Sequence, residues 1–149
     1  MSDKYFERGE AEELLPFIAQ RLAQARAFKQ EIDTLDAALA RTMARIMVLG
    51  GSIPPLTELS ERKWAREQLV GQLQEAVSGI QETGCLVKDV EEGLVDFPSL
   101  RDGEEVYLCW KLGEERIRYW HGIQEGFAGR KSLDDPCSDN LTDPTPRVQ

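Results

Sequence analysis

The residues best suited to chemistry gather between Val106 and Arg130. This stretch holds two of the three tryptophans, two of the three tyrosines and the only histidine of the chain. An imidazole near carboxylates can act in acid–base or metal chemistry, and aromatic side chains interleaved with cations suit the binding of a ligand or partner. We therefore expect the functional site in this stretch.

A metal site there would use His121 and Glu125, four residues apart, with Asp96 as a third ligand. Zinc sites usually show several His or Cys residues at set spacings, so the sequence favours no metal and no cofactor. Acid–base catalysis, as in a small hydrolase, would use Asp96, Glu114 and His121. That signal is weak as well, because nearly every acidic chain contains such carboxylates.

The segments EVYLCWKL and RIRYWH alternate around GEE, which predicts a β-hairpin with two alternative registers. In the first register one face is apolar and the other carries cations, with the facing pairs Leu112–Ile117, Trp110–Tyr119, Leu108–His121, Lys111–Arg118 and Cys109–Trp120. In the second register both faces are mixed, with the facing pairs Leu112–Arg116 and Trp110–Arg118. We prefer the first, because it separates polar from apolar side chains.

The preferred register has two consequences for function. Cys109 and His121 lie on opposite faces of the sheet, which argues against a cysteine nucleophile. Lys111 and Arg118 face each other as two like charges, which favours a nearby anion. That anion would be either Asp96 of the same chain or a bound anion or acidic partner. The surface expected to bind it consists of Lys111, Arg118, Trp120, His121 and Arg130.

A helical hairpin at about 10–83 should support this region. From Leu15 to Leu49 apolar or small residues recur at steps of three and four, a stripe typical of a coiled coil. Gly50, Gly51 and SIPPL end the helix, and a second stripe follows from Val70 to Ile80. An unbroken first helix would be about 50 Å long, longer than a compact domain of this size. Its uncovered stripe predicts a homodimer; the alternative is a break near Ala25–Phe28.

After Gly84 the pattern changes to alternation, which predicts an antiparallel β-meander of three or four strands at about 85–122, with one turn at Glu91–Gly93. The fold class is therefore α+β, with a single domain over 1–131. Residues 132–149 are rich in Asp, Pro, Ser and Thr, and we expect them to be a disordered acidic tail.

Charge and cysteine content narrow the class of protein. The net charge is -9, which disfavours nucleic acid and anionic membranes as partners. Three cysteines form no CxxC pair, and neither a signal peptide nor a membrane-spanning stretch is evident. These features predict a cytoplasmic protein.

Several motifs resemble a family of small prokaryotic proteins called domain of unknown function 2203. They are GCLVKD, GLVDFP, VYLCWKLGE, YWH and GFAGR, together with the opening YFERGEAEELLP. The resemblance supports a helical hairpin followed by a β-rich part, and it implies no activity. The positions that match the motifs are Asp96, Phe97, Pro98, Cys109, Trp110, Gly113, Glu114, Trp120, His121, Gly126, Phe127 and Arg130.

These observations favour a non-enzymatic module that binds an anion or an acidic protein partner and dimerises through its long helices. The alternative is the small hydrolase-like enzyme using Asp96, Glu114 and His121, with or without a metal. A third reading is a structural adaptor whose contact surface is the helices themselves.

Overall fold

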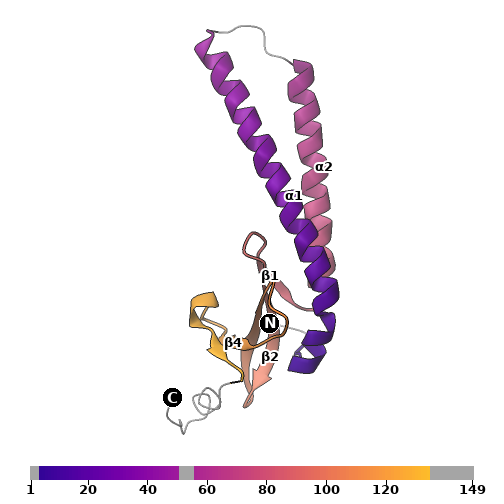
Figure 1. The fold of residues 1–149 in the computed structure, drawn as a ribbon, viewed down its shortest axis with the longest axis vertical. Coiled ribbons are helices and arrows are strands. Elements are labelled where there is room, and N and C mark those ends of the chain that lie inside the picture. The colour runs from indigo at the N-terminus through magenta and orange to yellow at the C-terminus, as the bar shows by residue number, and fades with distance from the viewer. Residues whose placement is uncertain (1–3, 51–55, 135–149) are drawn as a thin grey trace.

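The structure is a computed structural model, and it describes residues 4–50 and 56–134. Two antiparallel helices, α1 (Arg8–Val48) and α2 (Leu56–Gln81), form a long hairpin. A small β-sheet lies at the base of this hairpin, beside the N-terminal part of α1 (Figure 1). The molecule is therefore α+β, with a helical arm projecting from a sheet-based body, as the sequence predicts.

Helix α1 runs unbroken for 41 residues, or about 60 Å at 1.5 Å per residue. A capping box explains where the helix begins. The Glu7 side chain accepts a hydrogen bond from the Glu10 backbone amide, and the Glu10 side chain accepts one from the Glu7 backbone amide. Pro16 lies inside the helix on its exposed side and does not end it. The alternative of a break near Ala25–Phe28 is therefore wrong.

Five antiparallel strands form one sheet in sequential order, one strand more than the largest number predicted. A 3-10 helix, η1 (Phe127–Gly129), precedes the last strand. The strands are β1 (Leu86–Asp89), β2 (Leu94–Arg101), β3 (Glu104–Lys111), β4 (Tyr119–Gly122) and β5 (Lys131–Ser132).

The predicted tail begins too early. Ser132 belongs to β5, and Leu133 packs against the hydrophobic core. The Leu133 amide donates to the Arg118 carbonyl, and the Asp134 carboxylate pairs with Arg8 of α1. The packing of Leu133 and the ion pair of Asp134 thus attach the end of the sheet to the core and to the first helix. Residues 135–149, the rest of the predicted tail, lie outside the described residues.

The turn between β1 and β2 ends at Gly93, as predicted, and it requires glycine. The φ of Gly93 is 74°, in the left-handed region that side chains disfavour. A Cβ at this position would lie 2.6 Å from the Leu112 Cβ and 2.9 Å from Arg26. The Gly93 carbonyl also accepts from the Leu112 amide at 2.8 Å. This glycine therefore lets the turn pack closely against the connection that follows β3.

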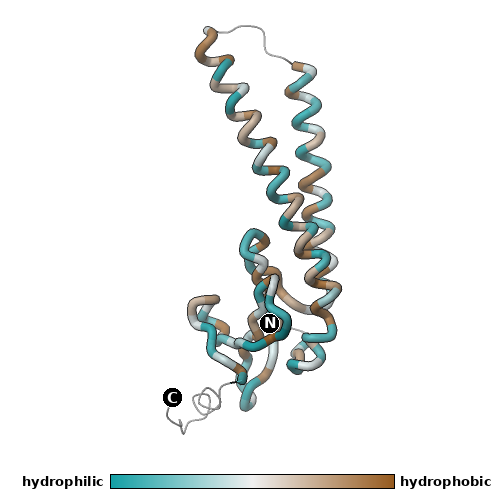
Figure 2. Tube along the Cα trace, viewed as in Figure 1, coloured by the Kyte–Doolittle hydropathy of each residue, from teal (hydrophilic) through white to brown (hydrophobic). Residues whose placement is uncertain are grey.

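The hydrophobic core lies between the sheet and the first half of α1 (Figure 2). Phe6 and Phe97 meet edge to face with their ring centroids 5.3 Å apart. Alternate residues of β2, β3 and β4 point to this side and pack against the apolar stripe of α1. The buried members are Leu15, Ile18, Leu22, Val95, Phe97, Val106, Leu108, Trp110 and Trp120.

The register between β3 and β4 is the one we did not prefer. Cys109 faces Tyr119, Leu108 faces Trp120 and Tyr107 faces His121. The preferred pairing of Leu108 with His121 is therefore wrong by one residue.

The reason lies in the connection between these strands, which is longer than a tight GEE turn. Glu114 accepts from the Lys111 amide at 2.8 Å through its carboxylate, and from the Trp110 indole at 2.9 Å through its carbonyl. Ile117 is fully buried in the core, and its amide donates to Glu12 of α1. These contacts set where β4 begins, and the expected facing pair of Lys111 and Arg118 is not formed.

Candidate functional site

The face of the sheet opposite the hydrophobic core carries polar side chains. Asp96 faces Cys109 across β2 and β3, Cys109 faces Tyr119, and Tyr107 faces His121. Side chains alternate between the faces of a strand, so these five residues share one side. The expectation that Cys109 and His121 lie on opposite faces is therefore wrong, because it depended on the other register.

Three of these side chains form a compact buried cluster, which we call the polar trio: Asp96, Cys109 and His121. Their exposed fractions are 2%, 1% and 2%. The His121 Nε2 lies 3.1 Å from the Asp96 Oδ2, and one potential ligand atom from each of the three residues lies within 4.8 Å of the others. Buried polar groups are normally hydrogen-bonded, and the His121 and Asp96 side chains lie within hydrogen-bond distance of each other.

The two ring nitrogens of His121 face different hydrogen-bond partners. Its Nδ1 lies 2.8 Å from the Gly122 carbonyl oxygen, which can only accept, so Nδ1 carries a proton. Nε2 then faces a carboxylate oxygen, and two lone pairs cannot bond each other. A second proton is therefore shared by Nε2 and Asp96, or a cation takes its place.

Cys109 completes the cluster as a thiol. Burial raises its pKa to about 12, and the negative charge of Asp96 acts in the same direction, while Arg130 opposes both. A thiol with so high a pKa is protonated at neutral pH and is a poor nucleophile. Because the trio is also closed to solvent, the geometry does not support a cysteine–histidine enzyme.

The segment after β4 covers this face of the sheet. Arg130 is the central contact, with 12% of its side chain exposed. Its guanidinium lies 4.1 Å from the Tyr119 ring centroid and 4.5 Å from that of Phe127. It donates to both oxygens of Glu114, at 2.7 and 3.0 Å, and to the Cys109 carbonyl at 3.3 Å. We call this contact the Arg130 clamp.

Glu125 is not part of the polar trio, although the sequence suggested it as a metal ligand. Its Oε1 accepts from the Gly122 amide at 2.7 Å and from the Lys131 Nζ at 2.6 Å. The bond from Lys131 is the main reason that the pKa of Glu125 is lowered. Two members of the suggested metal set, Asp96 and His121, do come together, and Cys109 lies beside them in place of Glu125. Only the correct register could have revealed Cys109 as the third member.

The residues of the suggested hydrolase site do not all belong to one cluster of the described structure. Asp96 and His121 are in contact, but Glu114 is engaged by Arg130 and by the backbone of Lys111. The sequence predicted that an enzyme would gather these three side chains around open volume. Instead, Asp96 and His121 are almost fully buried.

The five residues suggested for anion or partner binding do not form one exposed surface, although Lys111 and Arg130 both contact the Phe127 ring. Trp120 and His121 are buried, whereas Arg118 is exposed. Lys111 lies 3.4 Å from Glu92, and Arg130 is paired with Glu114. Two of the cations are thus already paired with carboxylates of the same chain, though not with Asp96.

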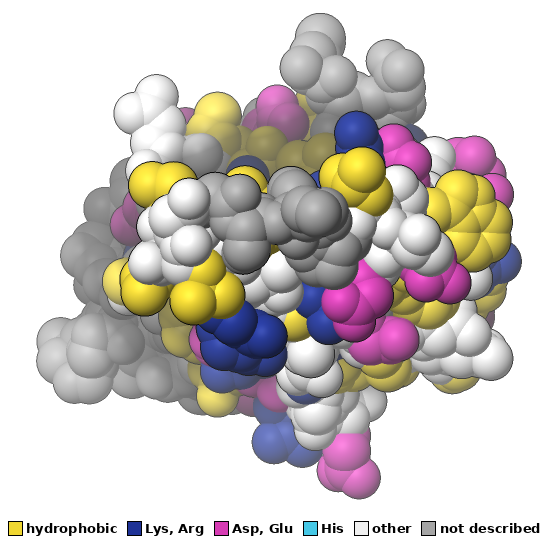
Figure 3. All heavy atoms as spheres, turned by 90° about the horizontal axis from the view of Figure 1, so that it is seen from above, with side chains coloured by type: hydrophobic (Ala, Val, Ile, Leu, Met, Phe, Trp, Pro, Cys, Tyr) yellow, Lys and Arg dark blue, Asp and Glu magenta, His cyan; other side chains and the backbone are white. Residues whose placement is uncertain are grey.

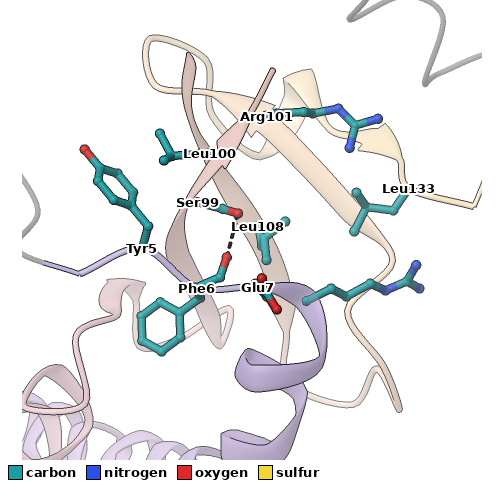
Figure 4. A pocket seen from close by; sticks show the side chains of 9 residues that line it. Tyr5, Phe6, Glu7, Ser99, Leu100, Arg101, Leu108 and Leu133 are labelled. Atoms are coloured by element: carbon teal, nitrogen blue, oxygen red, sulfur yellow. Dashed lines mark hydrogen bonds between the residues drawn. The ribbon is translucent and has the colours of Figure 1, made fainter. Parts of the chain in front are cut away.

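A surface hollow of about 490 Å³ lies on another side of the body (Figure 4). It is lined by Tyr5 to Arg8, by residues 99–101 at the end of β2, and by Leu108 and Leu133. Inside it the Ser99 hydroxyl donates to the Phe6 carbonyl at 2.7 Å. That bond attaches the N-terminal segment to the sheet, which gives the hollow a structural role.

The distal half of the helical hairpin is the second candidate surface. Within 33–50 and 56–75, Thr42 is the one buried residue, and it accepts from Arg62 at 2.9 Å. Apolar side chains nearby remain exposed: Met43 by 52%, Met47 by 79%, Val48 by 84%, Leu49 by 62%, Leu56 by 67% and Trp64 by 64%. Viewed along the long axis from the hairpin end, hydrophobic side chains lie openly at the surface (Figure 3).

The fold and these sites define an α+β protein with a long helical arm, a small antiparallel sheet and a buried polar trio. Residues 4–133 match the model of the family described as "Uncharacterized conserved protein (DUF2203)". The chain belongs to this family. Comparisons with curated proteins and with solved structures give no match. Among the described residues, no helix is long and apolar enough to cross a membrane.

Proposed function

We propose that this protein is a non-enzymatic protein-interaction module that forms a homodimer through the distal half of its helical hairpin. The observation that carries the proposal is the lack of a core in that half. Over 33–50 and 56–75 the two helices bury a single residue, Thr42, while several large apolar side chains stay exposed. Helices in bundles are stabilised by burying an apolar face, and two helices alone leave these faces open.

A second copy of the chain is the partner we favour. Two hairpins packed together make a four-helix bundle, in which all apolar stripes can face a shared core. A two-fold arrangement places the same patch of both chains in the interface, so one exposed patch is sufficient. The coiled-coil spacing of α1, with steps of three and four residues, suits such packing.

The anion-binding version of this function receives less support. Lys111 and Arg130, two of the cations expected to bind the anion, already lie against Glu92 and Glu114. Those internal carboxylates balance the positive charge that an external anion would otherwise balance. The cytoplasmic location stays a prediction from the sequence.

Sedimentation equilibrium of the full chain tests the proposal. The monomer has a mass of 16.8 kDa, and we expect twice that mass at micromolar concentration. The double variant Met43→Glu/Met47→Glu places charges on one side of α1 and should sediment as a monomer. The control is Leu100→Glu, which changes an apolar side chain of the sheet that is 53% exposed, and it should remain dimeric. A monomeric wild type, or a dimer that survives the double variant, would contradict the proposal.

A further inference from the structure

We propose that the polar trio of Asp96, Cys109 and His121 is a binding site for one zinc ion. The three side chains offer an oxygen, a sulfur and a nitrogen donor, a combination that suits zinc better than magnesium or calcium. They come from three adjacent hydrogen-bonded strands, β2, β3 and β4. This inference is independent of the proposed dimer, because it concerns the opposite end of the molecule.

The distances support a shared ion. In a tetrahedral zinc site with bonds of about 2.0–2.3 Å, neighbouring ligand atoms lie about 3.3–3.7 Å apart. Here the His121 Nε2 and the Asp96 Oδ2 are separated by 3.1 Å, and all three ligand atoms lie within 4.8 Å of one another. At the outer limit of 4.8 Å, ligand atoms would have to approach each other by about 1 Å to reach the edge length of this tetrahedron.

The orientation of His121 is the second observation that points to a cation. Zinc-bound histidines usually donate their other ring N–H to a carbonyl or carboxylate, which fixes the tautomer and aims the lone pair at the metal. The Gly122 carbonyl accepts from Nδ1 in this way at 2.8 Å. Nε2 is consequently directed at the Asp96 carboxylate inside a closed site, at a position that holds either a shared proton or a metal ion.

Charge balance explains how a dication could be tolerated in so buried a place. Without metal, the trio holds the Cys109 thiol proton and the proton shared by Asp96 and His121, and its net charge is zero. Zinc would replace about two protons, which leave to the solvent, and would bind a thiolate, a carboxylate and a neutral imidazole. The net charge stays zero, so the exchange adds no unpaired charge to the interior.

The surroundings of the trio are compatible with this exchange. Arg130 lies beside Cys109 and donates to its carbonyl at 3.3 Å, and both oxygens of Glu114 already balance its charge. The Tyr107 ring lies beside His121, with centroids 5.6 Å apart. Three protein ligands leave the fourth vertex of the tetrahedron without a ligand from the trio.

Metal titration of the full chain tests the proposal. Protein freed of metal with a chelator is titrated with Zn²⁺ alone, and we expect one ion per chain with release of about two protons. Co²⁺ as a spectroscopic probe should give a sulfur-to-cobalt charge-transfer band and the strong visible bands of tetrahedral coordination. Cys109→Ala should lose the charge-transfer band, and Asp96→Asn should weaken zinc binding at least about 100-fold.

Two cysteine variants serve as controls. Cys85→Ala alters the other described buried cysteine, whose thiol is hydrogen-bonded to the Ile80 carbonyl and the Thr83 hydroxyl. Cys137→Ala removes the third thiol of the chain. Both should keep the cobalt band. Because the chain has a single histidine, its ring nitrogen resonances are unambiguous, and Zn²⁺ should shift Nε2 while Nδ1 keeps its proton. Absence of stoichiometric zinc in the wild type, or a band that persists in Cys109→Ala, would overturn the proposal even if one of the variants failed to fold.

Discussion

Replacing Arg130 by methionine should destabilise the body more than replacing any exposed arginine. The methionine retains part of the apolar contact with Tyr119 and Phe127 but leaves the Glu114 carboxylate without its cation. The Arg130 and Glu114 side chains are 12% and 26% exposed, so solvent compensates only in part. Loss of a charge-assisted hydrogen-bonded pair in such a setting costs about 2–3 kcal/mol. The lost cation–π contacts, at 4.1 and 4.5 Å, add about 1 kcal/mol.

Urea unfolding followed by circular dichroism, in the presence of a chelator, measures this cost. Arg118→Met is the matched control, because Arg118 is exposed, and it should change the free energy of unfolding by less than about 0.5 kcal/mol. A double-mutant cycle with Glu114→Gln should give a coupling of about 1–2 kcal/mol with Arg130→Met. If the two substitutions were additive, or if both arginine variants behaved alike, the Arg130 clamp would not be a structural contact.

Two further predictions concern the turn before β2 and the arm. Gly93→Ala should cost about 2–3 kcal/mol of unfolding free energy, because its Cβ would lie 2.6 Å from Leu112 at a φ of 74°. Gly103→Ala, at a φ of 82° with no atom within 4 Å, should cost only about 1 kcal/mol in the same urea assay, and equal costs would refute the steric argument. In the arm, the hydrogen bond from Arg66 lowers the pKa of Asp36. The contribution of this pair to the free energy of unfolding is therefore complete above the usual carboxyl pKa, and it is lost as the pH falls through the lowered pKa of Asp36. Thermal unfolding of wild type and Asp36→Asn should therefore differ at neutral pH and converge in acid, and curves that stay parallel would contradict this.

The two proposals assign separate tasks to the two ends of the molecule. The sheet and the Arg130 clamp enclose the polar trio, whereas the helical arm carries an exposed apolar surface well away from it. Loss of zinc should therefore leave dimerisation unchanged, and charged substitutions at Met43 and Met47 should leave zinc binding unchanged. Either proposal, the zinc site or the dimer, can therefore be contradicted without affecting the other.

Local patterns in the sequence were sufficient for the elements themselves. The recurrence of apolar residues from Leu15 to Leu49 predicted the helix, Gly50 marked its end, and Gly93 marked the first turn of the sheet. Each of these signals depends on the residue and its near neighbours in the chain. The α+β class followed directly from the change of period after Gly84.

Only the tertiary structure decided the register of β3 against β4, and with it the site. The alternation around residues 107–121 favoured the register that separates polar from apolar side chains, and the structure has the other one. The choice was made by contacts distant in sequence or irregular in geometry: the Ile117 amide bound to Glu12 of α1, and Glu114 folded back onto the strand. Because a shift of one residue moves every side chain of a strand to the other face, the same contacts brought Cys109 beside Asp96 and His121.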